Sequence, residues 1–195
     1  MNIMKSSHIL STFLLSFTLT CTSSSFAIDD DNAMLNHIYH HFNKAFNTLD
    51  PQEMLFIYTQ DASYISNNQN KKILLGRKEI LEQYRAFFKK INDKKANIDV
   101  DFRIIQRHVE GKSATDIGYY LIRYYPDSGD EEPISEFAGK FVGVSKKYPN
   151  GHWYLVVETN NKADTAFYYN AKPQPNLYYG RQFTPINSEP TTTYE

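Results

Sequence analysis

The chain has 195 residues, with 21 Lys and Arg against 22 Asp and Glu, and its net charge is −1 at neutral pH. This balance, without any block of basic residues, argues against nucleic acid as a partner. Cys21 is the only cysteine and lies in an N-terminal segment that we expect to be removed, which excludes disulfides, thiol nucleophiles and cysteine-bound metals from the mature protein. The remaining length suits a single hydrophobic core.

Residues 1–27 have the pattern of a signal peptide. A single lysine precedes an apolar stretch from Ile9 to Leu19, which is too short for a stable membrane span, and Ser25 and Ala27 are the small residues that a signal peptidase reads. We therefore expect cleavage after Ala27, export to the periplasm or secretion, and no stable membrane span afterwards. A lipoprotein attached through Cys21 and an uncleaved anchor are the alternatives.

Three helices are predicted in the first half of the mature chain. Residues 33–47 carry an apolar stripe at helical spacing after a cap within Asp30–Asn32, and a third helix is predicted over 78–91. Between them, Asp50 and Pro51 open a short second helix, with Glu53 placed for a capping box. The buried candidates of this second helix are Met54, Leu55, Ile57 and Tyr58.

Beyond residue 97 the apolar pattern changes to a two-residue period, which predicts strands. Four long strands are expected at 97–109, 113–125, 134–147 and 152–159, and two short ones at 62–66 and 73–75. Three helices followed by a meander indicate an α+β fold with the sheet wrapped on the helices. We expect one domain over 28–170 and an extended or disordered Pro- and Tyr-rich tail over 171–195, in which 177–179 and Phe183 are able to dock on the domain.

Several short motifs follow one another along the chain in a characteristic order and spacing. Asp50 and Asp61-Ala62 are separated by ten residues, Gly76-Arg77-Lys78-Glu79-Ile80 opens the third helix, and Gly139-Lys140-Phe141 and residues 150–155 lie on paired strands. With these motifs the chain resembles the nuclear transport factor 2-like superfamily, close to its SnoaL-like (polyketide cyclase-like) branch, over about residues 34–161. The resemblance implies a cone-shaped curved antiparallel sheet that is packed on the three N-terminal helices and encloses a pocket, with an outer face that often pairs with a second subunit.

The superfamily includes isomerases, dehydratases, cyclases and epoxide hydrolases as well as non-enzymatic domains, so the resemblance does not give the function. Its steroid isomerases combine a tyrosine, a carboxylate base and a protonated acid. The matching positions here are Phe42, Ser66 and Ala138 or Gly139, and the carboxylate nearest to the third position is Glu136. Phe42 has no hydroxyl and Ser66 cannot abstract a carbon-bound proton, so we expect that this reaction is not the function.

An aromatic set on the predicted inner side of the fold is the feature that we favour as a binding site. Such a lining suits a flat apolar or aromatic ligand with one or two polar handles from tyrosine hydroxyls. A filled hydrophobic core without a cavity is the alternative. The predicted ligand-binding residues are Phe42, Tyr58, Tyr64, Ser66, Tyr84, Phe88, Tyr120 and Trp153.

Asp116 and Glu136 are the weak candidates for catalysis. An inward acid in an aromatic pocket would have a raised pKa and suit acid–base chemistry, whereas an acid at a strand end in solvent is the simpler interpretation. Arg77 is expected to form an ion pair. His37 and His41 lie on one flank of the first helix without an acidic partner, so we expect no metal and no cofactor.

The strand over 119–125 is apolar on both faces, which indicates that both are covered. One cover is the core, and the other is a second subunit or the tail; this pattern is the main argument for a homodimer. We expect an exported domain that binds a small apolar or aromatic ligand. The alternatives are a lyase or isomerase acting on a small hydrophobic substrate, favoured by an open pocket with an ionisable group, and a non-catalytic dimerisation or interaction module, favoured by a packed cone.

Overall fold

A computed structural model describes residues 24–129 and 131–186 of the chain. The predicted signal segment up to residue 23, Cys21 included, and the last residues of the tail lie outside the described residues, so export and signal cleavage stay predictions. Within the described part, no helix is long and apolar enough to cross a membrane.

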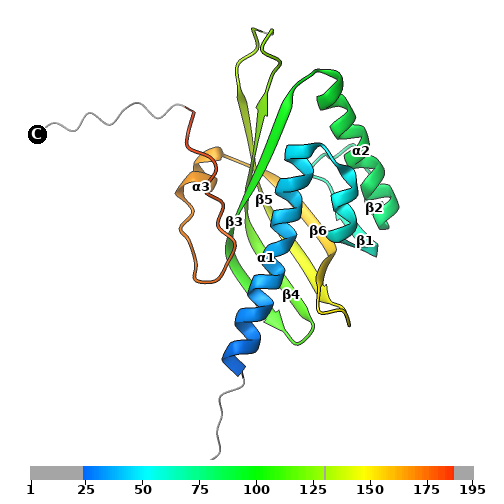
Figure 1. Ribbon diagram of the computed structural model, residues 1–195, viewed down its shortest axis with the longest axis vertical. Helices are drawn as coiled ribbons and strands as arrows, with labels where there is room; N and C mark the ends of the chain where they lie inside the picture. Colours follow the sequence, from blue (N-terminus) through cyan, green and yellow to red (C-terminus); the bar gives the residue numbers. More distant parts are fainter. Residues whose placement is uncertain (1–23, 130, 187–195) are drawn as a thin grey trace, which may run out of the picture.

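Helix α1 (Ser24–Thr48) lies along the sheet and begins before the start predicted at residue 33 (Figure 1). The acidic residues that we interpreted as a cap lie inside the helix, and Asp31 instead accepts bonds from Lys147 Nζ at 2.5 Å and Trp153 Nε1 at 3.1 Å. Contacts with distant strands therefore replace the capping role that the local pattern suggested.

The predicted second helix is a 3-10 helix, η1 (Pro51–Phe56), capped by Asp50, whose carboxylate accepts a bond from the Gln52 N–H at 2.9 Å. The prediction of a capping box was wrong, because Glu53 does not accept the Asp50 N–H. That N–H donates to the Ala45 carbonyl, and the Glu53 carboxylate lies 2.6 Å from Lys44 Nζ on α1. Met54, Ile57 and Tyr58 are buried as predicted, whereas Leu55 is 37% exposed and that prediction was wrong.

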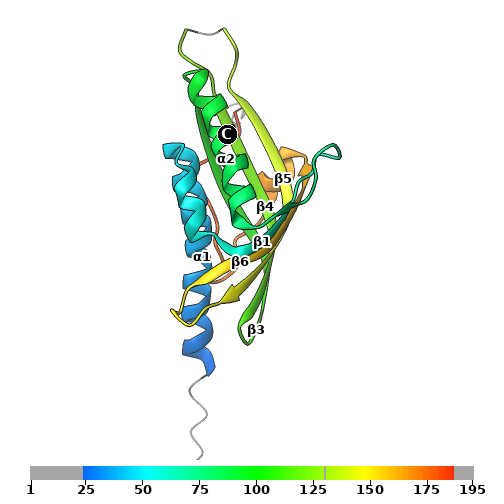
Figure 2. The same ribbon diagram turned by 90° about the vertical axis from the view of Figure 1, so that its right-hand side faces the viewer.

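Six strands form one curved sheet in the order β2-β1-β6-β5-β4-β3, which confirms the α+β cone. Neighbouring strands are antiparallel except β1 and β6, which are parallel. Figure 2 shows the sheet curving around α1 and α2, with α3 on its other side. The remaining elements are β1 (Tyr58–Ile65), β2 (Leu74–Leu75), α2 (Arg77–Asp93), β3 (Asn97–Glu110), β4 (Ser113–Tyr125), β5 (Ser135–Lys147), β6 (Trp153–Ala163) and α3 (Thr165–Asn170).

The inner face of the sheet carries the main core. Alternation along β4 points Tyr120, Ile122 and Tyr124 toward the helices, as predicted, and all three belong to this core. Tyr120 lies across Gly139 of β5, where a Cβ atom would approach its ring to 2.3 Å. Glycine is therefore required at this position for the tyrosine to lie flat over the neighbouring strand.

The second apolar face of β4 is covered by the chain's own C-terminal segment. Leu121 is fully buried and packs in a cluster with Ala138, Tyr168 and Phe183. Residues 178–180 also lie along the free edge of β3, where the Gly180 N–H donates to the Phe102 carbonyl at 2.7 Å. Docking of this segment is thus confirmed, and the part of this face around Leu121 needs no second subunit to cover it.

Candidate functional site

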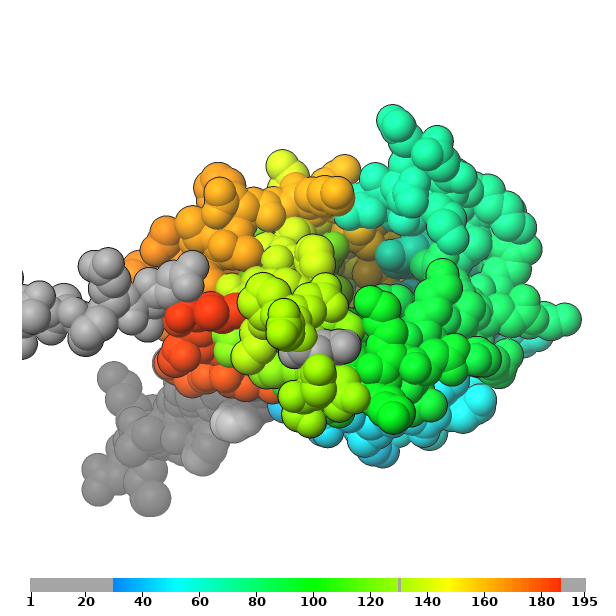
Figure 3. Space-filling model, turned by 90° about the horizontal axis from the view of Figure 1, so that it is seen from above, coloured from blue at the N-terminus to red at the C-terminus, as the bar shows by residue number. Residues whose placement is uncertain are grey.

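A cavity of about 570 Å³ opens between the inner face of the sheet and the helices. In Figure 3 a recess opens between the segments coloured as α2 and as the loop after β1. Its lining has an aromatic and aliphatic belt, a polar inner part and a polar mouth. The belt comprises Phe42, Phe46, Ala86, Phe87, Val100, Phe102 and Ile122, and the polar groups are Tyr64, Ser66, Asn67, Asn68, Lys71, Gln83, Tyr84, Lys90, Tyr120, Glu158 and Asn160.

Five of the eight predicted ligand-binding residues line this cavity: Phe42, Tyr64, Ser66, Tyr84 and Tyr120. The other three are buried elsewhere. Tyr58 lies behind the cavity wall, Phe88 packs edge-on against Phe46 in the core, and Trp153 donates its indole N–H to Asp31. The cone is therefore open over α2 and filled around Trp153.

Among the described residues that line the cavity, Glu158 is the only acid, and the sequence pattern did not predict it. The side chain is 8% exposed, and Tyr58 donates a short hydrogen bond to it. Burial raises the pKa of Glu158 from 4.5 to about 7, and the hydrogen bond from Tyr58 lowers it by a smaller amount. Among the described residues, no Lys, Arg or His forms an ion pair with this carboxyl group.

A bulge explains why the pattern of β6 concealed Glu158. Simple alternation from the inward Trp153 directs Glu158 to solvent. The pairing of β5 with β6 shifts between Val144 and Ser145, which leaves Val156 as an extra residue in β6. Because one extra residue exchanges the two faces of a strand, Glu158 turns into the cavity. No local residue pattern announces this bulge.

The tyrosines around Glu158 are held as neutral hydrogen-bond donors. Burial, assisted by the negative charge of Glu158, raises the pKa of Tyr64 and Tyr84 well above the usual value and that of Tyr120 to about 12. Asn160 Nδ2 donates to the Tyr64 hydroxyl at 3.0 Å, so the hydroxyl proton of Tyr64 is left to point elsewhere. The site therefore combines a carboxyl that titrates near neutrality with hydroxyls that keep their protons.

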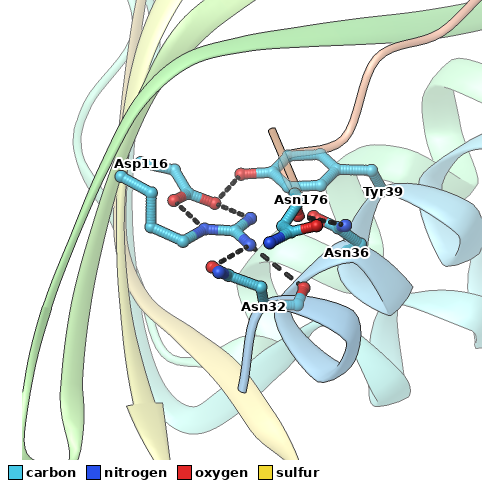
Figure 4. A network of polar contacts seen from close by, with 6 residues as sticks. Asn32, Asn36, Tyr39, Asp116 and Asn176 are labelled. Carbon is cyan, nitrogen blue, oxygen red and sulfur yellow. Dashed lines mark hydrogen bonds and ion pairs between the residues drawn. The ribbon is translucent and has the colours of Figure 1, made fainter. Parts of the chain in front are cut away.

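Asp116 faces inward but does not line the cavity. Arg107 holds both of its oxygens, Nε to Oδ1 at 2.6 Å and Nη2 to Oδ2 at 2.8 Å, and Tyr39 donates a bond of 2.5 Å (Figure 4). The same guanidinium donates to the Asn32 carbonyl of α1 at 3.1 Å. This buried network joins α1 to β3 and β4, and a carboxylate so fully engaged is a structural tie.

Glu136 lies on the outer face of the sheet, on the opposite side from the cavity. Arg123 Nη2 and the Tyr169 hydroxyl donate to its Oε1 at 2.5 and 2.6 Å, beneath the C-terminal segment. Arg77 departs from the expected ion pair, because it donates to the carbonyls of Leu55 and Tyr58, both at 3.2 Å. Neither Glu136 nor Arg77 is among the residues that line the cavity.

The histidines of α1 lie on the surface of the helix bundle. His41 Nδ1 lies 2.8 Å from a Glu53 carboxylate oxygen, and its ring stacks on Phe56. Among the described residues, no three His, Cys, Asp or Glu side chains are grouped closely enough to hold a metal ion.

Comparison with known proteins supports the fold. The chain is similar to an NTF2-like protein with a cystatin-like fold from Novosphingobium aromaticivorans, with a TM-score of 0.58 and 14% identity over 73% of this chain and 88% of that one. It is also similar to a ketosteroid isomerase-like protein from Erwinia carotovora atroseptica (TM-score 0.53, 15% identity, 69% and 97% covered) and to ActVI-ORFA from Streptomyces coelicolor (0.56, 14%, 67% and 95%).

No family model matches the chain, and no curated protein matches its sequence. Because the structural likenesses are at low sequence identity, they carry the fold alone. The fold is the nuclear transport factor 2-like cone, and any activity must be argued from the cavity itself.

Proposed function

We propose that the protein is an enzyme of the isomerase or lyase type, in which Glu158 transfers a proton on a small aromatic or apolar carbonyl compound bound in the cavity. The observation that carries this proposal is a buried carboxyl group, without a cationic partner among the described residues, on the wall of an open apolar cavity. An ionisable group in an open pocket favours the enzyme over a passive binding protein.

The chemistry follows from the protonation states in the cavity. The Glu158 carboxylate would remove a proton from a carbon next to the substrate carbonyl, and the protonated acid would return it at another carbon or to a leaving group. Hydroxyls such as those of Tyr64 and Tyr120 would donate hydrogen bonds to the oxygen on which negative charge develops. A general base is most effective when its pKa lies near the working pH, and the pKa of Glu158, about 7, meets this condition.

Proton exchange on a simple aromatic ketone tests the proposal without knowledge of the natural substrate. In D₂O at pH 7.5, the protein should accelerate deuterium incorporation next to the carbonyl of 2-tetralone, followed by NMR. Glu158→Gln should lower this rate at least about 100-fold, while Glu136→Gln should leave it unchanged. Equal rates for the wild-type protein and Glu158→Gln would contradict the assignment, and binding without exchange would favour a carrier.

We further propose that the protein is exported, which the charge and hydropathy pattern of residues 1–27 supports.

We also propose that the protein pairs with a second copy through the outer face of β1, β6, β5 and β4. Ile65, Ile117 and Val157 are exposed on that outer face, and exposed apolar groups gathered on one sheet face support pairing. Light scattering that gives the mass of a single chain for both the wild-type protein and Val157→Lys would contradict the proposed dimer.

A further inference from the structure

The mouth of the cavity differs in charge from its interior. Lys71 in the loop after β1 and Lys90 on α2 line the mouth, whereas Glu158 on β6 is the only acid that the described part of the chain contributes to the lining. We infer that the ligand carries a negatively charged group, such as a carboxylate, which Lys71 and Lys90 bind at the mouth while its other end reaches Glu158. This inference rests on the proposed function and specifies its substrate class as aromatic or apolar acids.

Lys71 and Lys90 differ from the lysines next to them in the sequence, which form ion pairs. Lys72 lies 2.8 Å from a Glu79 oxygen, and Lys89 lies 2.6 Å from an Asp93 oxygen. Lys71 and Lys90, next to them in the sequence, form no ion pair with any acid in the described part of the chain. In each of these two adjacent pairs, the lysine outside the cavity lining is neutralised by an acid, and the lysine in the lining is left to a partner of opposite charge.

The composition of the mouth adds neutral donors to this positive charge. Asn67, Asn68 and Gln83 line the cavity together with the two lysines, and their amides suit carboxylate oxygens. Between mouth and interior lies the belt of aromatic and aliphatic residues. A ligand that matches all three zones has an anionic end, a flat apolar body and a carbonyl or hydroxyl at the far end.

A purely structural role explains only one of the two lysines. Lys90 lies in the last turn of α2, where a cation interacts favourably with the helix dipole. Lys71 lies in a loop, where no helix end accounts for it. The structural role predicts an effect of Lys90 on stability alone, whereas the proposed site predicts that both lysines affect the affinity for anions.

Two fluorescent probes that differ by one charged group separate these explanations. 1-Anilinonaphthalene-8-sulfonate and N-phenyl-1-naphthylamine share the same aromatic skeleton, and only the first carries a sulfonate. At low salt, the combined variant Lys71→Gln/Lys90→Gln should bind the sulfonate roughly 5- to 10-fold more weakly and the neutral probe within about twofold of the wild-type protein. The loss should shrink at high salt, because salt screens exposed charges.

Matched controls assign the effect to the cavity. Lys89→Gln removes an adjacent lysine of α2 that is already paired, and both probes should bind this variant as they bind the wild-type protein. Ala86→Trp places a large ring in the cavity lining and should weaken both probes. Equal weakening of the two probes in the double lysine variant, or no weakening of the sulfonate, would overturn the anionic subsite.

The outcomes also separate this inference from the proposed function. If the double lysine variant loses no selectivity but Glu158→Gln still abolishes proton exchange on neutral 2-tetralone, the enzyme stands and the anionic subsite is wrong. If neither probe binds the wild-type protein and no exchange occurs, both proposals are wrong.

Discussion

At the scale of single residues, the proposed chemistry depends on the bulge in β6 that directs Glu158 into the cavity. Val156 is the extra residue that turns Glu158 from the outer face of the sheet into the cavity. Burial there raises the pKa of the carboxyl group, and the hydrogen bond that Tyr58 donates favours its ionised form by a smaller amount. The protonated form of this acid is therefore favoured up to about neutral pH.

The stability of the protein should therefore depend on the pH through Glu158. Because its pKa is about 7 in the folded state and about 4.5 when unfolded, the folded protein holds this proton more tightly. The stabilisation is complete below pH 4.5 and is lost as the pH rises through 7, by roughly 3 kcal/mol. Urea unfolding at pH 5 and pH 8 should show this loss in the wild-type protein relative to Glu158→Gln; a difference that is independent of pH would contradict it.

The sequence pattern predicts some of the residues that line the cavity and misses others. Phe42, Tyr64 and Tyr120 were predicted to line a pocket because helical spacing and strand alternation give the inward face directly. Trp153 also faces inward, but its end of the cone is filled, which depends on the packing of α1. Glu158 was missed because a bulge reverses alternation, and the residues around Val156 carry no sign of it.

At the scale of elements, the network of Asp116, Arg107 and Tyr39 holds α1 against β3 and β4. Replacing Asp116 with Asn leaves the Arg107 side chain, which is 1% exposed, without a compensating charge. The free energy of unfolding should fall by about 3–5 kcal/mol. Tyr39→Phe removes one hydrogen bond of the same network and should cost about 1 kcal/mol. Urea unfolding measures both changes.

The same variant distinguishes a structural from a catalytic role of Asp116. Under conditions where Asp116→Asn is folded, proton exchange on 2-tetralone should match that of the wild-type protein, since this residue does not line the cavity. Loss of exchange with unchanged stability would assign catalysis to Asp116 after all.

The C-terminal segment depends on Arg103 of β3. Its guanidinium donates to the carbonyls of Tyr168, Tyr169 and Gly180 at 2.7 to 3.2 Å and lies between the rings of Tyr168 and Tyr179. Arg103→Met keeps an apolar stem but leaves the carbonyls without their donor, at a cost of about 2–4 kcal/mol. Hydrogen exchange over residues 176–183 should become at least tenfold faster.

Arg181→Met is the matched control, because Arg181 is exposed and its guanidinium carbon lies over the Tyr179 ring, 4.9 Å from its centroid. Exchange in this variant should stay as in the wild-type protein. Unchanged exchange in Arg103→Met would mean that the apolar cluster around Phe183 holds the segment without the arginine.

Element positions were largely predictable, and their partners were not. The strand over 113–125 agrees with β4 because its turn and loop residues bound a clear alternation. The same alternation indicated that both faces are covered. It did not distinguish a second subunit from the chain's own tail, since either one buries the same apolar side chains. The start of α1 was misplaced because acidic residues that cap many helices here contact distant strands.

At the scale of the whole molecule, the cone is filled at the end near Trp153 and open at the end near α2. Its outer face is partly covered by α3 and the segment after it. On the inner face this arrangement leaves an open, largely apolar cavity that contains the buried Glu158. Charge along that cavity runs from the lysines at its mouth to this acid within. The proposed function requires that Glu158 titrates near neutral pH and that a ligand reaches it.

Glu158 can be titrated by ¹³C NMR with glutamate labelled at the side-chain carboxyl, and its signal is assigned by its loss in Glu158→Gln. This measurement tests directly whether the group ionises near neutral pH and responds to a ligand. We expect a midpoint near pH 7 and a change in both the signal and its midpoint when N-phenyl-1-naphthylamine binds. A midpoint near the ordinary value of 4.5, or a signal that does not respond to the bound probe, would contradict it.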